Sequence, residues 1–125
     1  MERTIGMNTL TRITNLRLRA IIGTNQWERN APQDVTVNVE FEFDGSKPAR
    51  TDDLNDVIDY KALTKRISNF VEGSQFFLLE KLSASILELV MQEPRVQRAS
   101  VTVDKPGALR FADSVSVTCR ATRGE

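Results

Sequence analysis

The stretch DVTVNVEFEF, residues 34–43, alternates apolar and polar side chains without interruption. Side chains of a β-strand point alternately to opposite faces, so this pattern predicts a strand with its valines and phenylalanines buried and its polar residues outside. A strand with one wet face is typical of an antiparallel sheet. The chain is therefore limited to folds in which such a sheet is covered on one side only.

Three other segments, residues 12–22, 96–105 and 111–120, show the same alternation over shorter lengths. In the first of them, Leu16 and Leu18 share the apolar face. These segments predict three further strands.

Two amphipathic helices are expected between the second and the third strand. The first begins after Asp59, a good N-cap residue, and is broken by Gly73. The second extends from about Phe76 to Gln92 and is stopped by Pro94.

The predicted order is ββααββ, an α+β fold with a four-stranded antiparallel sheet and two helices on one face. We expect residues 10–121 to form this single domain, between a flexible N-terminal tail of residues 1–9 and a C-terminal tail of residues 122–125. The outer strands of such a sheet expose unpaired backbone edges, which favour pairing with another chain. We therefore expect a homo-oligomer.

The charge and the apolar content argue against several function classes. The 125 residues carry 17 basic and 17 acidic side chains, and this balance does not indicate a nucleic-acid binder. No apolar run is long enough to span a bilayer and the first residues have no apolar signal core, so we expect no membrane partner. A single cysteine cannot form an internal disulfide, which fits a cytoplasmic protein.

The chain contains no histidine, which restricts any catalytic chemistry. Histidine is the commonest general base near neutral pH, and its absence removes Ser-His and Cys-His nucleophile pairs. Catalysis would have to use Lys, Tyr, Asp, Glu or a bound cofactor.

Lys105 stands out in the stretch VTVDKPGALRFADS. It continues the apolar parity of Ala99, Val101 and Val103, and Pro106 follows it directly. A lysine at a strand end commonly extends its amine to solvent. The alternative is a lysine held in a partly apolar site, where desolvation lowers the pKa of the amine and makes it a proton acceptor near neutral pH.

Three further side chains could carry chemistry, although each also has a structural explanation. Glu80 lies on a second apolar stripe of the second helix; it could accept two parallel N–H donors from a planar group, or be paired at the surface. Tyr60 could relay protons, or pack at a helix start with its hydroxyl near water. Glu28 is most simply a solvated loop charge.

Four stretches together resemble one known family: NLRLRAIIG, ARTDDLNDVIDY, VEGSQFFLLEKL and VDKPGALRFADSVSVT. From about residue 12 to residue 119, the chain resembles the dihydroneopterin aldolases and, more closely, the dihydroneopterin triphosphate 2′-epimerases of bacteria. LRLR-x-x-IG and ALRFADSVS look more like the epimerases, whereas KPGA looks more like the aldolases.

The resemblance implies the tunnelling fold (T-fold), whose members form rings of four subunits that stack in pairs into an octamer with active sites between subunits. It implies that Lys105 is the principal acid–base residue, that Tyr60 assists proton transfer, and that Glu28 lies near Lys105. It also implies that Glu80 anchors the aminopyrimidinone edge of a pterin and that Leu79 adds a backbone contact.

The implied chemistry is a retro-aldol cleavage between C1′ and C2′ of 7,8-dihydroneopterin or its triphosphate, which places the enzyme in or near folate biosynthesis. The dihydropterin ring accepts the electrons, so no metal or cofactor is implied. We expect epimerisation at C2′ with some aldolase activity. The alternatives are a dedicated folate-pathway aldolase, which releases glycolaldehyde and 6-hydroxymethyl-7,8-dihydropterin, and a ring protein that binds pterin without catalysis. Candidates for binding a triphosphate are Arg17, Arg19 and Arg110.

Overall fold

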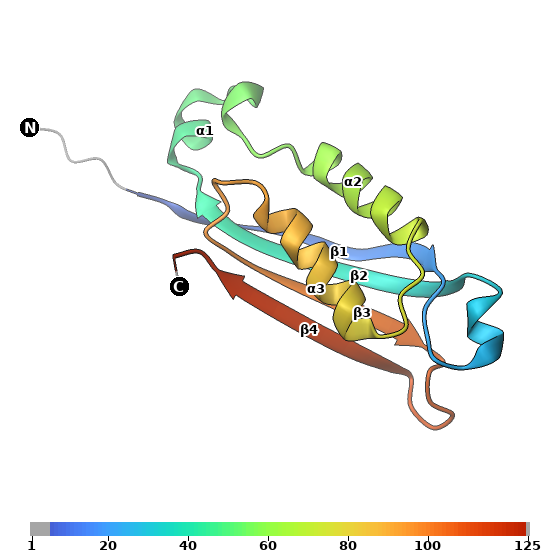
Figure 1. The fold of residues 1–125 in the computed structure, drawn as a ribbon. Coiled ribbons are helices and arrows are strands. Elements are labelled where there is room, and N and C mark those ends of the chain that lie inside the picture. The colour runs from blue at the N-terminus through green and yellow to red at the C-terminus, as the bar shows by residue number, and fades with distance from the viewer. Residues whose placement is uncertain (1–5, 125) are drawn as a thin grey trace, which may run out of the picture.

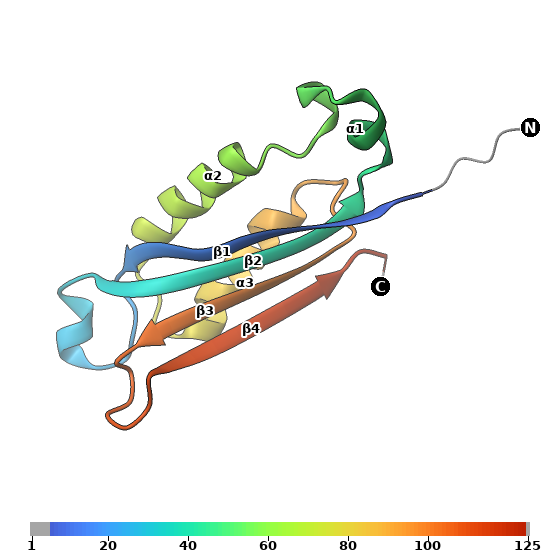
Figure 2. The same cartoon turned by 180° about the vertical axis from the view of Figure 1, so that it is seen from behind.

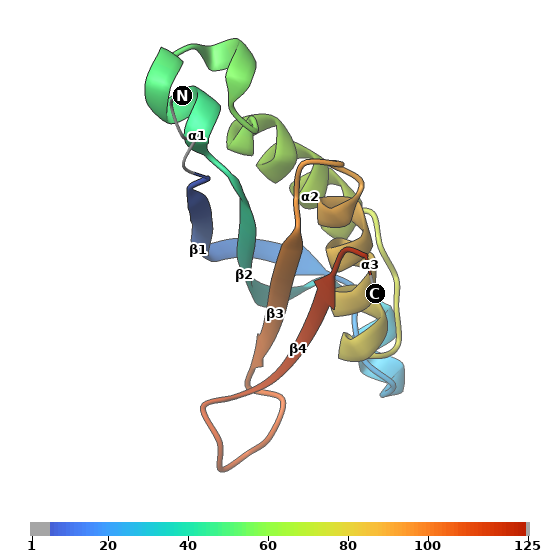
Figure 3. The same ribbon diagram turned by 90° about the vertical axis from the view of Figure 1, so that its left-hand side faces the viewer.

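Four strands form one antiparallel sheet in the order β1-β2-β3-β4 in the computed structural model, which describes residues 6–124. The strands are β1 (Asn8–Ala20), β2 (Gln33–Asp44), β3 (Arg98–Pro106) and β4 (Ser114–Thr122). The helices α2 (Tyr60–Glu72) and α3 (Leu79–Met91) lie across one face of the sheet (Figure 1), and no helix of the described residues covers the opposite face (Figure 2). The view from the side shows the two layers (Figure 3). The predicted α+β fold, with two helices on one face of a four-stranded antiparallel sheet, is confirmed.

The connections contain short elements that the predicted order ββααββ does not include. A 3₁₀ turn, η1 (Gln26–Arg29), joins β1 to β2. A short helix, α1 (Ser46–Thr51), and a second 3₁₀ turn, η2 (Leu54–Asp56), lie between β2 and α2. These elements have 4, 6 and 3 residues, so no hydrophobic period marks them in the sequence.

The core lies between the sheet and the two helices. The apolar side chains of β2 are all buried as predicted: Val35, Val37, Val39, Phe41 and Phe43. They share one cluster with buried residues of the helices, Leu63, Ile67, Val71, Leu82, Ile86, Leu87 and Val90. Burial of a side chain of this size stabilises the fold by about 1.5–3 kcal/mol. The helices therefore pack on the face of the sheet to which the apolar side chains of β2 point.

A β-bulge in β1 interrupts the alternation of that strand. Asn15 has a φ of 54°, and the register with β2 shifts between Ile13 and Leu16. The backbone N–H of Asn15 donates a hydrogen bond to Oδ1 of Asn38 at 2.8 Å, which fixes the bulge. Asparagine tolerates this left-handed conformation. Because the bulge adds one residue to β1, Ile13 and Leu16 face the same side of the sheet although they are three positions apart.

Strand pairing extends into both segments that were expected to be tails. β1 begins at Asn8 rather than at residue 12, because Asn8 pairs with Asp44 at the end of β2. β4 ends at Thr122, which pairs with Arg98. The remaining parts of the expected tails lie partly outside the described residues, at 1–5 and 125.

The helix boundaries agree with the sequence at α2 and differ at α3. The carboxylate of Asp59 accepts the backbone N–H groups of the second and third residues of α2, both at 3.0 Å, and so caps this helix as predicted. α3 begins at Leu79 rather than at Phe76. The reason is that the backbone carbonyls of Gln75 and Phe76 accept hydrogen bonds from the side chain of Arg29 and do not enter the helix.

The start of each of the last two strands is also later than predicted. β3 begins at Arg98 and β4 at Ser114. Residues 107–113 form the loop between them, in which Gly107 has a φ of +75°. An alternating pattern cannot distinguish such a loop from the adjoining strand, because the loop carries apolar residues of its own.

The second apolar stripe predicted on α3 is not an exposed surface. Leu87 is buried in the core, whereas Glu80 in the same row is exposed to solvent rather than set into an apolar groove. Instead, large apolar side chains are exposed in three loops at one end of the sheet (Figure 1). They are Trp27, Phe77, Leu78, Leu109 and Phe111.

Candidate active site

Lys105 is buried at the end of β3. Its exposed fraction is 9%, and it lies on the same side of the sheet as Val101 and Val103. The prediction that this amine is kept from water is confirmed, and the alternative that it extends to solvent is wrong. A buried ammonium requires an oppositely charged or hydrogen-bonding partner.

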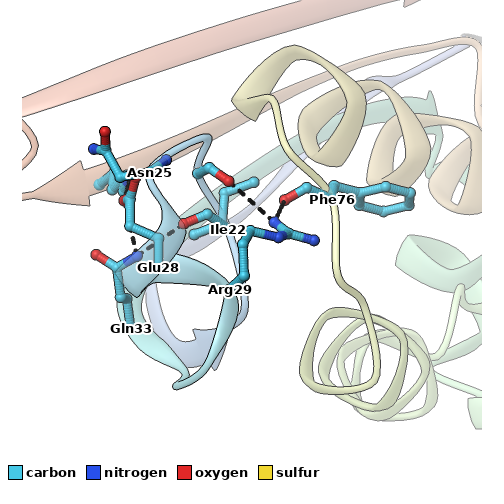
Figure 4. Close-up of polar contacts among 8 residues, drawn as sticks. Ile22, Asn25, Glu28, Arg29, Gln33 and Phe76 are labelled. Carbon is cyan, nitrogen blue, oxygen red and sulfur yellow. Dashed lines mark hydrogen bonds and ion pairs between the residues drawn. The ribbon is translucent and has the colours of Figure 1, made fainter.

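The partner of Lys105 is Glu28, which lies in η1. Its exposed fraction is 3%, and its carboxylate forms an ion pair with the Lys105 ammonium. It also accepts hydrogen bonds from Nε2 of Gln33 at 3.0 Å and from the backbone N–H of Asn25 at 3.1 Å (Figure 4). The expectation of a solvated loop charge is therefore wrong, because η1 turns this side chain toward the end of β3.

The environment of Glu28 keeps its carboxyl group ionised. Burial raises the pKa of Glu28, but hydrogen bonds from Lys105, Gln33 and Asn25 and the charge of Lys105 more than offset this effect. As a result, the pKa of Glu28 falls from 4.5 to about 2. The Glu28 carboxylate is therefore an anion at every pH near neutrality, and in this form it holds the lysine amine.

Gly23 leaves the space that this carboxylate occupies. Its φ is +124°, and a Cβ atom at this position would lie 2.2 Å from Cδ of Glu28 and 2.3 Å from both carboxylate oxygens. Only glycine fits where the chain leaves β1 and turns into η1.

Leu79 and Glu80 form the first turn of α3, at the same end of the sheet as η1 and the end of β3 (Figure 1). Among residues 6–124, no side chain caps this helix, whose N-cap position is occupied by Leu78. The first N–H groups of a helix have no partner within it and carry partial positive charge, so they can bind an electronegative atom of a ligand. Glu80 is exposed beside them, and an ionised carboxylate accepts N–H donors.

Tyr60 is not brought to this end of the sheet. It is 54% exposed at the first position of α2. α2 has 13 residues and is therefore about 20 Å long, and its last turn is the one that lies toward η1 (Figure 1). Within one chain, Lys105, Glu28, Leu79 and Glu80 thus lie at one end of the sheet, while Tyr60 lies about a helix length away.

The residues that hold Glu28 in place were missed by the sequence reasoning. Glu28 accepts the backbone N–H of Asn25, and the spacing Asn-x-x-Glu is a signature of a capping box that could have been found. Gln33 also donates to the carbonyl of Ile22 at 2.8 Å, and no sequence pattern marks it. The side chain of Arg29 donates a hydrogen bond to a backbone carbonyl 47 positions away, so no local sequence pattern marks it either.

The candidates for triphosphate binding are three arginines whose contacts differ from those of the Lys105–Glu28 pair. Arg19 is exposed and pairs with Asp34 at 3.3 Å, and Arg110 lies 5.5 Å from the ring centroid of Phe111. Arg17 lines a shallow hollow that also includes Pro106.

In the part of the chain that the structure describes, no group of three or more His, Cys, Asp or Glu side chains could hold a metal ion. No helix among the same residues has the length and apolar character needed to cross a membrane.

The helix pair on one face of the four-stranded antiparallel sheet agrees with the tunnelling fold that the resemblance implies, and the buried ion pair of Lys105 and Glu28 lies where β3 ends. Comparison with known sequences gives the family. The profile of the dihydroneopterin aldolase family matches residues 11–120, and the chain belongs to this family. The resemblance read from the sequence motifs is therefore confirmed.

Individual relatives cover most of the chain. It is 42% identical over 109 residues to the dihydroneopterin triphosphate 2′-epimerase of Escherichia coli (strain K12), which covers 87% of this chain and 91% of that protein. It is 29% identical over 105 residues to the dihydroneopterin aldolase of the same strain, covering 84% of this chain and 86% of that protein. The crystal structure of the E. coli dihydroneopterin aldolase in complex with neopterin matches with a TM-score of 0.86 at 26% identity, covering 90% of this chain and 98% of that one.

Proposed function

We propose that this protein acts on the side chain of 7,8-dihydroneopterin or its triphosphate by retro-aldol cleavage of the C1′–C2′ bond, mainly with epimerisation at C2′ and with some aldolase activity. The preference for epimerisation is supported by the identity of 42% to an epimerase, against 29% to an aldolase. The single observation that carries the chemistry is the buried Lys105–Glu28 pair at the end of β3.

In the proposed reaction, Lys105 exchanges protons with the substrate. A base takes the proton of the 2′-hydroxyl group, the C1′–C2′ bond breaks, and its electron pair moves into the dihydropterin ring. With dihydroneopterin as substrate, this cleavage forms glycolaldehyde, and protonation of the remaining enamine at C1′ gives 6-hydroxymethyl-7,8-dihydropterin. If the aldehyde turns over and adds again, the C2′ centre is inverted. The ring is the electron acceptor, so the proposed reaction requires neither a metal nor a cofactor.

Glu28 has two tasks in this scheme. It holds the Lys105 amine in one position, and it compensates the charge of the ammonium in a site with little access to water. A positioned acid–base group contributes about 10²–10⁴-fold to a rate, so loss of this alignment would be visible in kcat.

The start of α3 is proposed as the pterin anchor. The Glu80 carboxylate would accept the two N–H donors of the aminopyrimidinone edge, and the uncapped first turn at Leu79 would bind the ring carbonyl. Glu80→Ala is then expected to weaken pterin binding by about 10- to 100-fold, because a charge-assisted hydrogen bond is lost. An affinity equal to that of the unaltered protein would exclude the anchor role.

Tyr60 is proposed to reach the site of a second copy of the chain, where it would assist proton transfer. Its position about a helix length from Lys105 supports this arrangement, as do the edge strands β1 and β4, which have no further partner in the described chain. We propose a homo-octamer of two stacked rings of four, in the cytoplasm, with sites between subunits. Light scattering tests the assembly, and a monomer would contradict it.

A dedicated aldolase is the second candidate. The KPGA stretch favours it, and Gly107 with its φ of +75° lies next to open space beside the proposed site. Turnover of dihydroneopterin and of its triphosphate, with product analysis, separates the two: inversion at C2′ identifies an epimerase and glycolaldehyde release an aldolase.

A ring protein that binds pterin without catalysis is the third candidate, and Lys105→Ala tests it. We expect turnover to fall by about 10²–10⁴-fold with pterin binding retained. The matched control is Lys65→Ala, which removes an exposed lysine of α2 and is expected to keep full activity. If the unaltered protein binds pterin but turns over neither substrate, the enzymatic proposal is wrong.

A further inference from the structure

Arg29 connects the two halves of the proposed site. It follows Glu28 in η1, and its half-buried side chain lies against the segment that leads into α3 (Figure 4). Nη1 donates hydrogen bonds to the backbone carbonyls of Gly23 at 3.1 Å and Phe76 at 2.9 Å. Nη2 donates to the carbonyl of Gln75 at 2.5 Å. One guanidinium thus joins two loops that are 46–47 residues apart in the sequence.

The aromatic ring of Phe77 completes this contact. Cζ of Arg29 lies 4.1 Å from the ring centroid, within the range of a cation–π interaction. Three consecutive residues, 75–77, therefore contact a single side chain of η1. Only Leu78 separates them from the first turn of α3.

We propose that Arg29 is a positioning residue that fixes the separation between the pterin anchor at Glu80 and the acid–base pair of Lys105 and Glu28. This inference rests on the proposed function. Arg29 donates hydrogen bonds to backbone carbonyls of the irregular segment before α3, and it acts through these carbonyls. A misplacement of about 1 Å in a reacting geometry lowers a rate by about 100-fold, so a contact of this kind affects turnover even at a distance from the bond that breaks.

An arginine suits this position better than a lysine. The guanidinium presents five N–H donors in a planar fork and reaches carbonyls of two segments at once, whereas a lysine has all its donors on one nitrogen. Arg29→Lys should therefore keep the charge and part of the hydrogen bonding, with an intermediate loss of turnover.

The test compares Arg29→Met with a matched control at the other end of α3. Arg123 also donates to three backbone carbonyls, those of Val96 at 2.8 Å, Met91 at 2.6 Å and Glu93 at 3.2 Å. Both variants lose one arginine that binds three carbonyls, so both are expected to unfold at a lower temperature. Only Arg29→Met is expected to change catalysis.

Two ligands separate positioning from a general loss of structure. A pterin without a side chain at C6 occupies only the anchor, whereas dihydroneopterin triphosphate reaches both halves of the site. For Arg29→Met we expect kcat on the full substrate to fall by about 10- to 100-fold, while the Kd of the short pterin stays within about threefold. For Arg123→Met we expect neither to change. Equal kcat in the two variants would overturn the inference, as would a parallel loss of kcat and of short-pterin binding.

Hydrogen exchange at the backbone amides of residues 75–80 gives a readout that does not depend on turnover. Faster exchange in Arg29→Met than in Arg123→Met is expected, because the irregular segment loses its contact with η1. If exchange is equal in both variants, the inference fails even if the protein is an active enzyme. If the unaltered protein turns over neither substrate, the proposed function fails and the positioning role falls with it, while a difference in exchange would still establish the contact.

Discussion

Lys105→Met removes the ammonium from the buried pair and leaves the Glu28 carboxylate without its charged partner. In the unaltered protein the pKa of Glu28 is lowered from 4.5 to about 2. A carboxyl group whose pKa is lowered by folding contributes stability above pH 4.5, and this stability is lost as the pH falls toward 2, because the unfolded chain binds the proton more readily. At about 1.36 kcal/mol for each pKa unit, the contribution is about 3 kcal/mol.

In the variant, we expect this group to make stability depend less on pH. Burial still opposes the charge of Glu28, and without Lys105 only the hydrogen bonds from Gln33 and Asn25 remain to offset it. The pKa of Glu28 in the folded variant is then expected to be higher than in the unaltered protein, so that protonation at acid pH relieves the unpaired charge. Removing one partner of a buried pair costs about 3–5 kcal/mol at neutral pH, and this deficit should shrink toward pH 3.

Urea unfolding at a fixed protein concentration between pH 7 and pH 3 measures this effect. The free energy of unfolding of the unaltered protein should fall across this range more steeply than that of Lys105→Met. Lys65→Met, which removes an exposed lysine, should keep the slope of the unaltered protein. If Lys105→Met also keeps that slope, the pair does not determine the pKa of Glu28 and the reasoning is refuted.

Substitutions at three further positions test contacts that stabilise the fold. Gly23→Ala places a Cβ atom 2.2 Å from the Glu28 carboxyl carbon and should destabilise the fold by at least about 2 kcal/mol in thermal unfolding; an unchanged midpoint would contradict the tight fit. Asp59→Ala removes the N-cap of α2 and should cost about 1 kcal/mol in urea unfolding, whereas Asp59→Asn should recover most of it. Ser83→Ala removes a buried hydrogen bond of 3.0 Å to the carbonyl of Val101 and should cost about 1 kcal/mol, and a more stable variant in urea would show that this bond is not needed.

Patterns within a few neighbouring residues were enough to predict those strands and helices that such residues determine. The alternation of β2 identified the buried face of the sheet, and Asp59 marked the start of α2, because each depends on side chains a few positions apart. The parity of β3 placed Lys105 on the apolar face, but it left open whether the amine is buried or reaches solvent. The bulge at Asn15 could not be predicted in the same way, since it depends on Asn38 in another strand.

The resemblance to the family predicted that Glu28 lies near Lys105, and the ion pair between them agrees with this, whereas the residues alone did not indicate it. Glu28 resembled a solvated charge because η1 has no apolar pattern, and its burial is decided by a lysine 77 positions away. The resemblance to the family implies that Tyr60 and Lys105 act in the same site, between subunits. The chain places them about a helix length apart, which no pattern along one sequence could reveal.

The separation of 77 positions between Glu28 and Lys105 also governs when the site can appear during folding. Helices and the β1–β2 hairpin involve neighbouring residues and can form early, whereas this pair requires the third strand to join the sheet. On a ribosome, the first hundred residues therefore emerge without the ion pair of Lys105 and Glu28. After denaturation, re-formation of this pair therefore reports that β3 has joined the sheet, which is a later event than the return of helical signal.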